Sequence, residues 1–273
     1  MFTRAVRTAS EFTFPYVGLR RRRCGEVYSS IGAFVVVNAD GWVLTSAHLV
    51  QEILAVQQQA ASAATATGDA PAESCAEHAE IWALPGFAET KPHLAEAIVR
   101  PLADIALVRL EPFDAAVIGG LPSLRDPGTH PIEQGMSVCR LGYPFHDISA
   151  EWSEPSHEFK LPPQAFPVPA FALEGIVARF HRIAADDGSG EATFVETSTP
   201  GLRGQSGGPL LDVEGRVCGI QSHTTHLDLG FDARYGVGDQ IVTERQFLNV
   251  GAATHVADVV AFLAETNVTH RLA

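Results

Sequence analysis

The stretch that decides the fold is Gly204–Leu210 (GQSGGPL), in which a serine stands among glycines. Two shorter stretches precede it: Thr45–His48 (TSAH) supplies a histidine, and Ala103–Val108 (ADIALV) supplies an aspartate. A serine hydroxyl is a weak nucleophile at neutral pH, so it needs a base such as histidine, which a carboxylate in turn orients. Each stretch alone is a weak signal. The three in the order His, Asp, Ser predict a nucleophilic serine site.

The chemistry of such a site gives each residue an expected role. His48 takes the proton from Ser206 and later passes it to the leaving group, while Asp104 fixes the imidazole tautomer and stabilises the imidazolium. The backbone N–H groups of Gly204 and Ser206 are expected to form the oxyanion hole, because they can point at the oxygen on which negative charge develops.

Four stretches resemble the trypsin/chymotrypsin superfamily of serine proteases, and most closely its bacterial high-temperature-requirement (Deg) branch. They are Ile31–Val36 (IGAFVV) leading to the His48 motif, the Asp104 motif, Leu141–Pro144 (LGYP) and the Ser206 motif, and the resemblance covers roughly residues 29–251. The resemblance implies an all-β fold of two antiparallel β-barrels with a C-terminal helix. It also implies that the first barrel supplies His48 and Asp104, that the second supplies Ser206, and that the site lies in the cleft between them.

On this basis residues 1–273 are expected to form a single serine protease unit. Its expected parts are an N-terminal extension (1–28), a first barrel (29–130), a second barrel (131–250) and the C-terminal helix (251–273). The 67 residues after Ser206 suffice for the last strands and a helix. They do not suffice for the peptide-binding module that Deg proteases usually append.

Local patterns predict the same class of fold without the resemblance. Short runs of β-branched and aromatic residues punctuated by Gly, Pro and Asp predict strands at 34–37, 42–44, 105–110, 171–180, 192–197, 209–211 and 216–220. One helix is predicted over 254–265, because Val256, Val259, Val260 and Leu263 share a helical face. The proline-rich stretch 149–169 predicts a long extended loop, and 57–77 predicts either a prolonged helix or a surface loop.

The resemblance also places a specificity pocket between two segments. Its expected lining residues are Pro200, Gly201, Leu202, Arg203, Gln221, Ser222, His223 and Thr224. Ser222 is further expected to hydrogen-bond Asp104. None of the lining residues is a carboxylate, so cleavage after Arg or Lys is not expected. A small or medium apolar residue before the cut is the first choice. An acidic residue recognised by His223, His226 or Arg203 is the alternative.

Composition limits the remaining classes of function. A net charge of −13 argues against nucleic-acid binding, and no apolar run is long enough to predict a membrane span. Residues 1–30 lack the apolar core of a secretion signal, and the four cysteines lack the pattern of secreted trypsins, so a cytoplasmic bacterial protein with free thiols is expected. The run Arg20–Arg23 predicts either a solvated segment or a docking site for an acidic partner.

Neither a metal nor a cofactor is expected. His223, His226 and Asp228 form an H-x-x-H-x-D pattern, but structural and catalytic zinc sites usually need three or four well-spaced ligands. A serine nucleophile with its base needs no further group to form an acyl-enzyme.

The sequence therefore predicts a serine endopeptidase that cuts protein or peptide substrates. Gln205 stands where digestive trypsins carry the aspartate that pairs with a newly cut N-terminus, so that activation route is excluded. The enzyme is then either always competent or controlled by a regulatory protein partner. Two alternatives stay open: a catalytically silent binding module with a protease fold, and an esterase that uses the same site.

Overall fold

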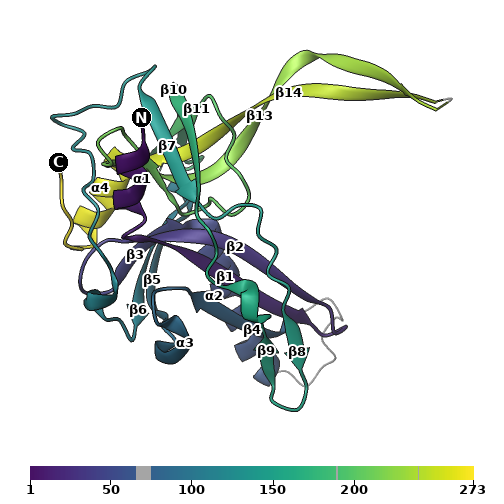
Figure 1. The fold of residues 1–273 in the computed structure, drawn as a ribbon. Coiled ribbons are helices and arrows are strands. Elements are labelled where there is room, and N and C mark those ends of the chain that lie inside the picture. The colour runs from purple at the N-terminus through teal and green to yellow at the C-terminus, as the bar shows by residue number, and fades with distance from the viewer. Residues whose placement is uncertain (66–74, 189, 239) are drawn as a thin grey trace.

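Two antiparallel β units stand side by side in the computed structural model, which describes residues 1–65, 75–188, 190–238 and 240–273 (Figure 1). The first is a six-stranded sheet whose edge strands approach each other, which gives it the curvature of a half-barrel. The second is a closed barrel. The predicted all-β, chymotrypsin-like fold with a C-terminal helix is confirmed.

The strands of each unit follow one another in space as follows. The first sheet runs in the order β4 (Cys75–Trp82), β1 (Thr13–Arg22), β2 (Val27–Val36), β3 (Trp42–Ser46), β6 (Ile105–Glu111) and β5 (His93–Arg100). The barrel runs in the order β10 (Phe171–Ala184), β11 (Glu191–Thr197), β14 (Gln240–His255), β13 (Val217–Val237), β12 (Pro209–Leu211) and β7 (Ser137–Gly142). Every strand run predicted above falls within one of these strands or extends one by a residue or two.

Shorter elements connect the strands. The helices are α1 (Thr3–Ala9), α2 (Ala47–Thr65), α3 (Phe87–Thr90) and α4 (Val256–Glu265), with 3₁₀ turns η1 (Pro101–Ala103), η2 (Ala115–Val117) and η3 (Pro163–Ala165). None of the helices in the described part of the chain is long and apolar enough to cross a membrane. The sequence predicts either a prolonged helix or a surface loop over residues 57–77. The helix α2 continues as far as Thr65, and residues 66–74 lie outside the described part of the chain.

The N-terminal segment is not an extension, which corrects the expected boundary at residue 28. β1 lies inside the first sheet, where it pairs with both β2 and β4. α1 packs on the second barrel instead, because Phe2 and Ala5 share a buried cluster with Cys139 of β7. The strand has no alternation of buried and exposed residues that would reveal it in the sequence, because residues 15–19 are all buried and arginines follow them.

Three of the four arginines in the run Arg20–Arg23 form ion pairs within the chain. Arg20 pairs with Glu52, Arg21 pairs with Glu154, and Arg22 pairs with Glu26. Two of these guanidinium groups also lie over the ring of Tyr28. These arginines therefore belong to the surface of β1, and nothing in their contacts supports the docking site for an acidic partner.

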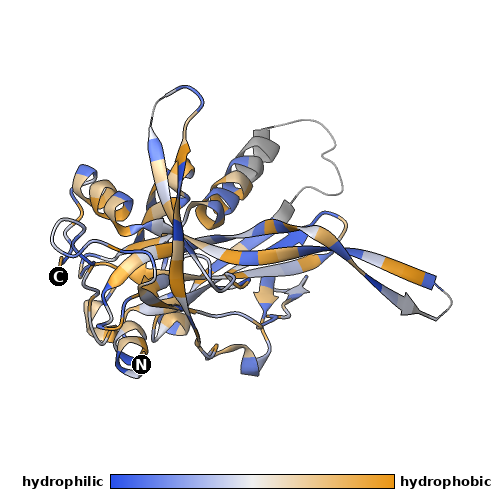
Figure 2. Cartoon of the chain, turned by 90° about the horizontal axis from the view of Figure 1, so that it is seen from above, coloured by the Kyte–Doolittle hydropathy of each residue, from blue (hydrophilic) through white to orange (hydrophobic). Residues whose placement is uncertain are grey.

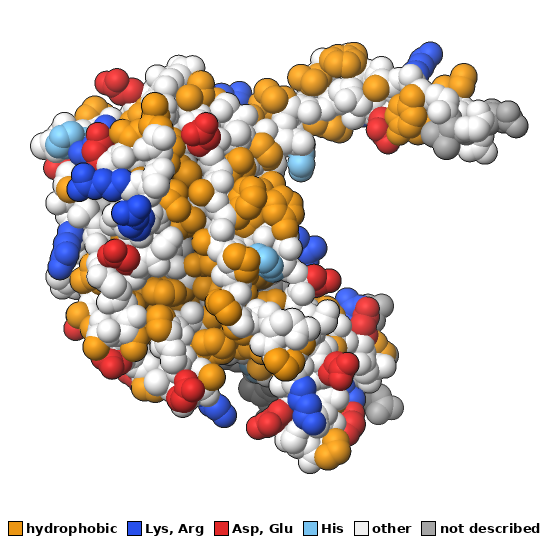
Figure 3. Space-filling view, in the orientation of Figure 1, with side chains coloured by type: hydrophobic (Ala, Val, Ile, Leu, Met, Phe, Trp, Pro, Cys, Tyr) orange, Lys and Arg blue, Asp and Glu red, His pale blue; other side chains and the backbone are white. Residues whose placement is uncertain are grey.

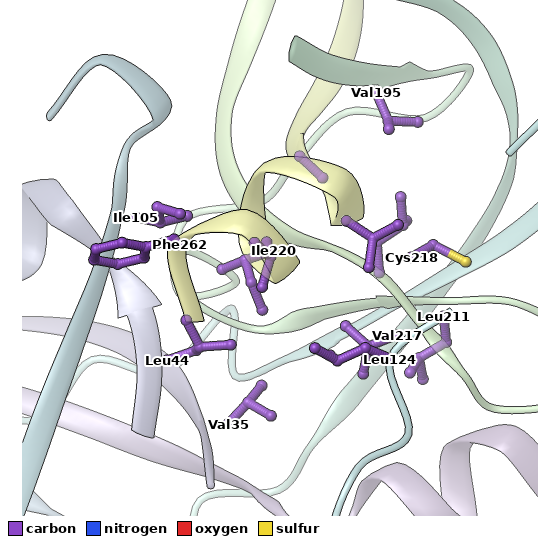
Figure 4. Packing of buried hydrophobic residues seen from close by; sticks show 14 of the residues in the cluster. Val35, Leu44, Ile105, Leu124, Val195, Leu211, Val217, Cys218, Ile220 and Phe262 are labelled. Carbon is purple, nitrogen blue, oxygen red and sulfur yellow. The ribbon is translucent and has the colours of Figure 1, made fainter. Parts of the chain in front are cut away.

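One hydrophobic core joins the two β units (Figure 4). It contains Val35 and Leu44 of the first sheet together with Leu211 and Ile220 of the barrel. The predicted C-terminal helix closes the same core, because its apolar face (Val256, Val259, Phe262, Leu263) is buried. The helix begins at Val256 and not at Thr254, since the His255 ring accepts a hydrogen bond from the N–H of Ala257 and caps it. Shared burial fixes the two units as one body and so fixes the cleft between them.

The proline-rich stretch 149–169 is more ordered than predicted. It contains a small two-stranded sheet formed by β8 (Glu151–Ser153) and β9 (Glu158–Lys160). Ile148, Phe159 and Phe166 pack against β1 in a separate cluster, so most of this segment covers the first sheet. Apolar residues between the prolines anchor this segment to the first sheet. The prolines taken alone predict only an extended loop.

A long hairpin leaves the barrel where β13 and β14 continue beyond their barrel partners (Figures 1 and 2). Figure 3 shows apolar side chains along this arm. The exposed large apolar residues of the hairpin are Leu229, Phe231, Tyr235, Ile241, Phe247 and Leu248. The arm begins directly after the strand residues expected to line the specificity pocket.

Asp212, in the turn between β12 and β13, provides a test of the packing in the second barrel. Its buried carboxylate pairs with Arg125 (2.8 Å) and Arg216 (2.7 Å) and accepts the Glu214 and Arg216 N–H groups. We expect Asp212→Ala to lower the free energy of unfolding by about 3 kcal/mol, because it leaves two guanidinium groups without their carboxylate. Chemical denaturation measures this. The control Glu265→Ala, which removes an exposed pair with Arg100, should cost at most about 1 kcal/mol, and equal losses would contradict the assignment.

Candidate active site

Asp104 is held by a tight turn at the start of β6. The 3₁₀ turn η1 ends at Asp104, whose N–H donates to the Pro101 carbonyl (3.0 Å). Its φ is +47°, in the left-handed region that residues other than glycine rarely adopt. The Asp104 carbonyl also accepts the N–H of Ala47 (3.1 Å), the first residue of α2. The backbone thus fixes this carboxylate relative to the start of α2.

His48 lies in the first turn of α2 and faces Asp104. Its backbone N–H donates to Asp104 Oδ1 (3.0 Å), and its ring Nδ1 lies 3.1 Å from Oδ1 and 3.0 Å from Oδ2. An ionised carboxylate only accepts, so Nδ1 carries a proton and donates. Nε2 is therefore left as the acceptor, which is the tautomer that a general base needs.

Burial and charge act in opposite directions on this pair. Burial lowers the pKa of His48, but the hydrogen bond and the negative charge of Asp104 outweigh it, so the pKa lies above its ordinary value. Burial raises the pKa of Asp104, but hydrogen bonds from His48 and Ser222 and the charge of His48 bring it below its ordinary value. Each residue stabilises the charged form of the other.

Backbone hydrogen bonds from both β units fix the Ser206 loop. The Ser206 carbonyl accepts the N–H of Ala33 on β2 (2.8 Å). On the other side, Gly207 N–H donates to the Gln221 carbonyl of β13 (2.8 Å), and Gln221 N–H donates to Gly208 (2.8 Å). A Cβ at Gly207, where φ is +84°, would lie 2.1 Å from the Ala33 carbonyl oxygen, so only glycine fits.

The Ser206 side chain and His48 line the same pocket. The Ser206 hydroxyl donates to the carbonyl of Ser222 (3.1 Å), and among the described residues no hydrogen bond joins it to His48. The hydroxyl is therefore directed to the backbone of β13. Catalytic hydrogen bonds of this type often form only when substrate is bound.

Two backbone donors next to Ser206 are unused. Gln205 N–H donates to Leu202 (2.9 Å) and Gly208 N–H donates to Gln205 (2.9 Å), but within the described residues neither Gly204 N–H nor Ser206 N–H has an acceptor. Gly204 has φ +97°. These two N–H groups are the donors that the sequence predicts for an oxyanion hole.

A pocket of about 260 Å³ opens beside Ser206. Seven of the eight expected specificity residues line it, together with His48 and Ser206: Gly201, Leu202, Arg203, Gln221, Ser222, His223 and Thr224. Pro200 does not line it, because the chain turns away there and the Pro200 carbonyl faces Arg140. The Thr224 hydroxyl donates to the Gly201 carbonyl (2.6 Å) and so ties the two walls together.

Ser222 links Asp104 to a second histidine. Its hydroxyl donates to Asp104 Oδ2, as the sequence predicts, and lies 2.8 Å from His223 Nδ1. Since the single hydroxyl proton is given to Asp104, His223 must donate from a protonated Nδ1. Burial lowers the pKa of His223, which favours this neutral form.

The H-x-x-H-x-D pattern does not converge. His226 Nδ1 lies 2.6 Å from Asn249 Oδ1 across the hairpin, and Asp228 pairs with Arg245. In the described part of the chain no three His, Cys, Asp or Glu side chains are grouped to hold a metal ion. Cys24, Cys139 and Cys218 are free thiols.

Sequence reasoning missed one residue next to the pocket. Arg140 of β7 is buried, and its Nε donates to the side-chain oxygen of Gln221. The signal was available, because an arginine in the otherwise apolar run before Leu141–Pro144 is unusual for a buried strand.

The sequence matches the trypsin-like peptidase domain over residues 32–220, which is more than half of the chain. The chain belongs to this family. No curated protein sequence is significantly similar to it.

Among solved structures, an HtrA-type protease, AlgW, bound to a tripeptide is similar with a TM-score of 0.53 and 15% identity, over 98% of this chain and 64% of that one. A variant of AlgW with a decapeptide has a TM-score of 0.53 and 14% identity, over 98% of this chain and 68% of that one. At this identity the likeness concerns the fold. The chain spans about two thirds of the length of these proteases.

The electrostatic coupling between His48 and Asp104 can be tested directly. We expect Asp104→Asn to lower the pKa of His48, because it removes the charge that outweighs burial. An NMR titration of the histidine rings, with His48→Gln to assign the signal, measures this. The titration of His255, a buried histidine at the start of α4, should stay unchanged. An unmoved His48 signal would show that Asp104 does not control the imidazole.

Proposed function

We propose that this protein is a serine endopeptidase whose catalytic triad is His48, Asp104 and Ser206. The observation that carries the proposal is that an Asp104-oriented imidazole and Ser206 line one pocket, while the loop that carries Ser206 holds two unused N–H donors. These are the parts that acyl transfer needs: a nucleophile, a base and an anion site.

The reaction follows from this geometry. When a peptide carbonyl enters the pocket, the Ser206 hydroxyl turns from the Ser222 carbonyl to His48 Nε2, loses its proton to it and attacks the carbonyl carbon. The N–H groups of Gly204 and Ser206 stabilise the resulting oxyanion. His48 then protonates the leaving amine and an acyl-enzyme remains. Water, activated by the same histidine, releases the acid and restores Ser206.

A peptide is the substrate that the surrounding backbone fits. β12 pairs with β13 only as far as Ile220, so from Ser222 onward this edge of β13 is open to an added strand. Main-chain hydrogen bonds of an extended peptide to an open strand edge supply affinity with little sequence dependence. The AlgW structures with a tripeptide and a decapeptide support peptide binding in this fold.

The loop before Ser206 needs no new N-terminus to hold it. The side-chain oxygen of the fully buried Gln205 accepts the N–H of Leu202 (2.9 Å), so an amide within the chain braces the turn that presents Gly204. This favours an enzyme that is competent as folded. A regulatory protein partner, a cytoplasmic location and a bacterial origin remain predictions, as do the alternatives of a silent binding module and an esterase.

Replacement of the nucleophile tests the proposal. Ser206→Ala should abolish labelling by a fluorophosphonate and lower kcat for peptide hydrolysis by roughly 10⁴–10⁶, and His48→Ala should lose about as much, because triad members act as a unit. Circular dichroism should show an unchanged fold. Retention of most of the activity in Ser206→Ala would refute the site, and normal labelling without any peptide hydrolysis would favour the esterase.

The pH profile gives a second test. His48 accepts a proton only when neutral, and its pKa is raised above the ordinary 6.5, so kcat/KM should fall as the pH drops through a midpoint above 6.5. In Asp104→Asn, kcat should fall by roughly 10⁴, as it does when chymotrypsin-like proteases lose this carboxylate. A profile that stays flat between pH 5 and 8 would contradict the role of His48.

A further inference from the structure

A buried positive charge without a carboxylate lies behind the specificity pocket. Arg140 is only 1% exposed. Its Nε donates to Gln221 Oε1 (2.5 Å), and its Nη1 donates to Thr199 Oγ1 (2.8 Å) and to the Pro200 carbonyl (3.4 Å). All three acceptors are neutral. No carboxylate of the described residues lies within ion-pair distance of this guanidinium.

The remaining nitrogen of Arg140, Nη2, is buried and has no hydrogen-bond acceptor. Nη2 lies close to two glycines, Gly251 and Gly201. A Cβ atom built on Gly251 would lie 2.2 Å from Nη2 and 2.7 Å from the backbone nitrogen of Gly201. Gly201 lines the pocket, as does Gln221, whose side chain Arg140 holds. The unused donor therefore lies directly behind the pocket wall.

An unpaired guanidinium in this position is costly. Transfer of an ion from water to a protein interior costs several kcal/mol unless an opposite charge compensates it. Burial lowers the pKa of Arg140 to about 10, so the group still carries its proton at neutral pH. The neighbouring thiol of Cys139 does not compensate the charge, because burial raises its pKa to about 11. The nearby buried carboxylate of Glu196 already pairs with Arg179.

We propose that the missing anion comes from the substrate: the residue before the scissile bond is acidic, and its carboxylate pairs with Arg140. This inference rests on the proposed function, since it names the substrate class of the same pocket. Gly201, whose backbone nitrogen lies on the same side of Gly251 as Nη2, lines the pocket together with Thr224, which hydrogen-bonds it. The carboxylate has to displace this hydrogen bond to reach Nη2.

The proposal changes the order of the two expectations from the sequence. The sequence favours a small or medium apolar residue, because the expected lining offers no carboxylate for Arg or Lys. An acidic residue was the alternative, but with His223, His226 or Arg203 as its partner. His226 is engaged by Asn249, and Arg203 also borders a second, open pocket with Phe145 and His146. Arg140 is the buried cation, and a desolvated charge discriminates between substrates more strongly than an exposed one.

Peptides that differ only in the residue before the cut test the proposal. With Glu, Asp, Gln, Val and Lys at that position, kcat/KM for Glu or Asp should exceed that for the isosteric Gln by roughly 10–100-fold, because Gln brings no charge to Arg140. Equal or better cleavage after Gln, Val or Lys overturns the proposal.

Variants of Arg140 identify the residue responsible. Arg140→Met should reduce the ratio of Glu to Gln cleavage to about one, and Arg140→Lys, which keeps the charge, should retain part of it. The matched control Arg109→Met, at an exposed arginine of β6, should leave the ratio unchanged. An acidic preference that survives in Arg140→Met assigns it to another cation and overturns the proposal. Should Arg140→Met fail to fold, the lysine variant and the peptide series still decide.

A fluorophosphonate separates this proposal from the function on which it rests. If Ser206 of the unaltered protein is not labelled and no peptide is cut, the protease assignment fails. If Ser206 is labelled and peptides are cut without any preference for acidic residues, the protease assignment stands and only the role of Arg140 fails.

Discussion

The structure depends on Gln221, the residue at which its two halves and its pocket meet. The Gln221 carbonyl accepts the N–H of Gly207 and the hydroxyl of Ser46, and its N–H donates to Gly208. This one residue of β13 thus ties the nucleophile loop to the barrel and the barrel to the first sheet, directly before α2. Together with the hydrogen bond from Ala33 to the Ser206 carbonyl, it places Ser206 relative to His48, since the two residues come from different units and share no hydrogen bond among the described residues.

Most of the site could be predicted from the sequence because its chemistry is local. A serine among glycines, a histidine after a strand and an aspartate before one each carry their own signal, whereas the pocket residues are implied by the resemblance to serine proteases. The N-terminal strand could not be predicted, since arginines replace the apolar residues at its end and their partners Glu52 and Glu154 are distant in sequence. The sequence marks Arg140 as unusual in an apolar run, but it does not predict the surroundings of this arginine, which are built by Thr199, Gln221 and Gly251 and which only the barrel brings together.

The same contacts explain why the loop before Ser206 is formed without a cleaved N-terminus. An ion pair in that position couples activity to proteolysis, whereas the amide of Gln205 bonds to a backbone N–H three residues away. A bond of that kind forms with the fold itself and does not depend on another chain. The hairpin of β13 and β14 continues the strand that lines the pocket, so the exposed arm and the pocket wall belong to the same strand.

Arg140 gives a physical reason for selectivity in a pocket whose lining is almost neutral. Gln221 holds the guanidinium through Nε and at the same time holds the strand wall through Ala252 and His223. The cation is therefore fixed in place before any substrate arrives, and its desolvation has already occurred during folding. A substrate carboxylate then loses only its own hydration on entering, which lowers the cost of recognition for an acidic residue and leaves it unchanged for a neutral one. Gln221 of β13 holds both the guanidinium of Arg140 and the loop that carries Ser206. Substrate selection by Arg140 and catalysis by Ser206 would therefore be coupled through one strand.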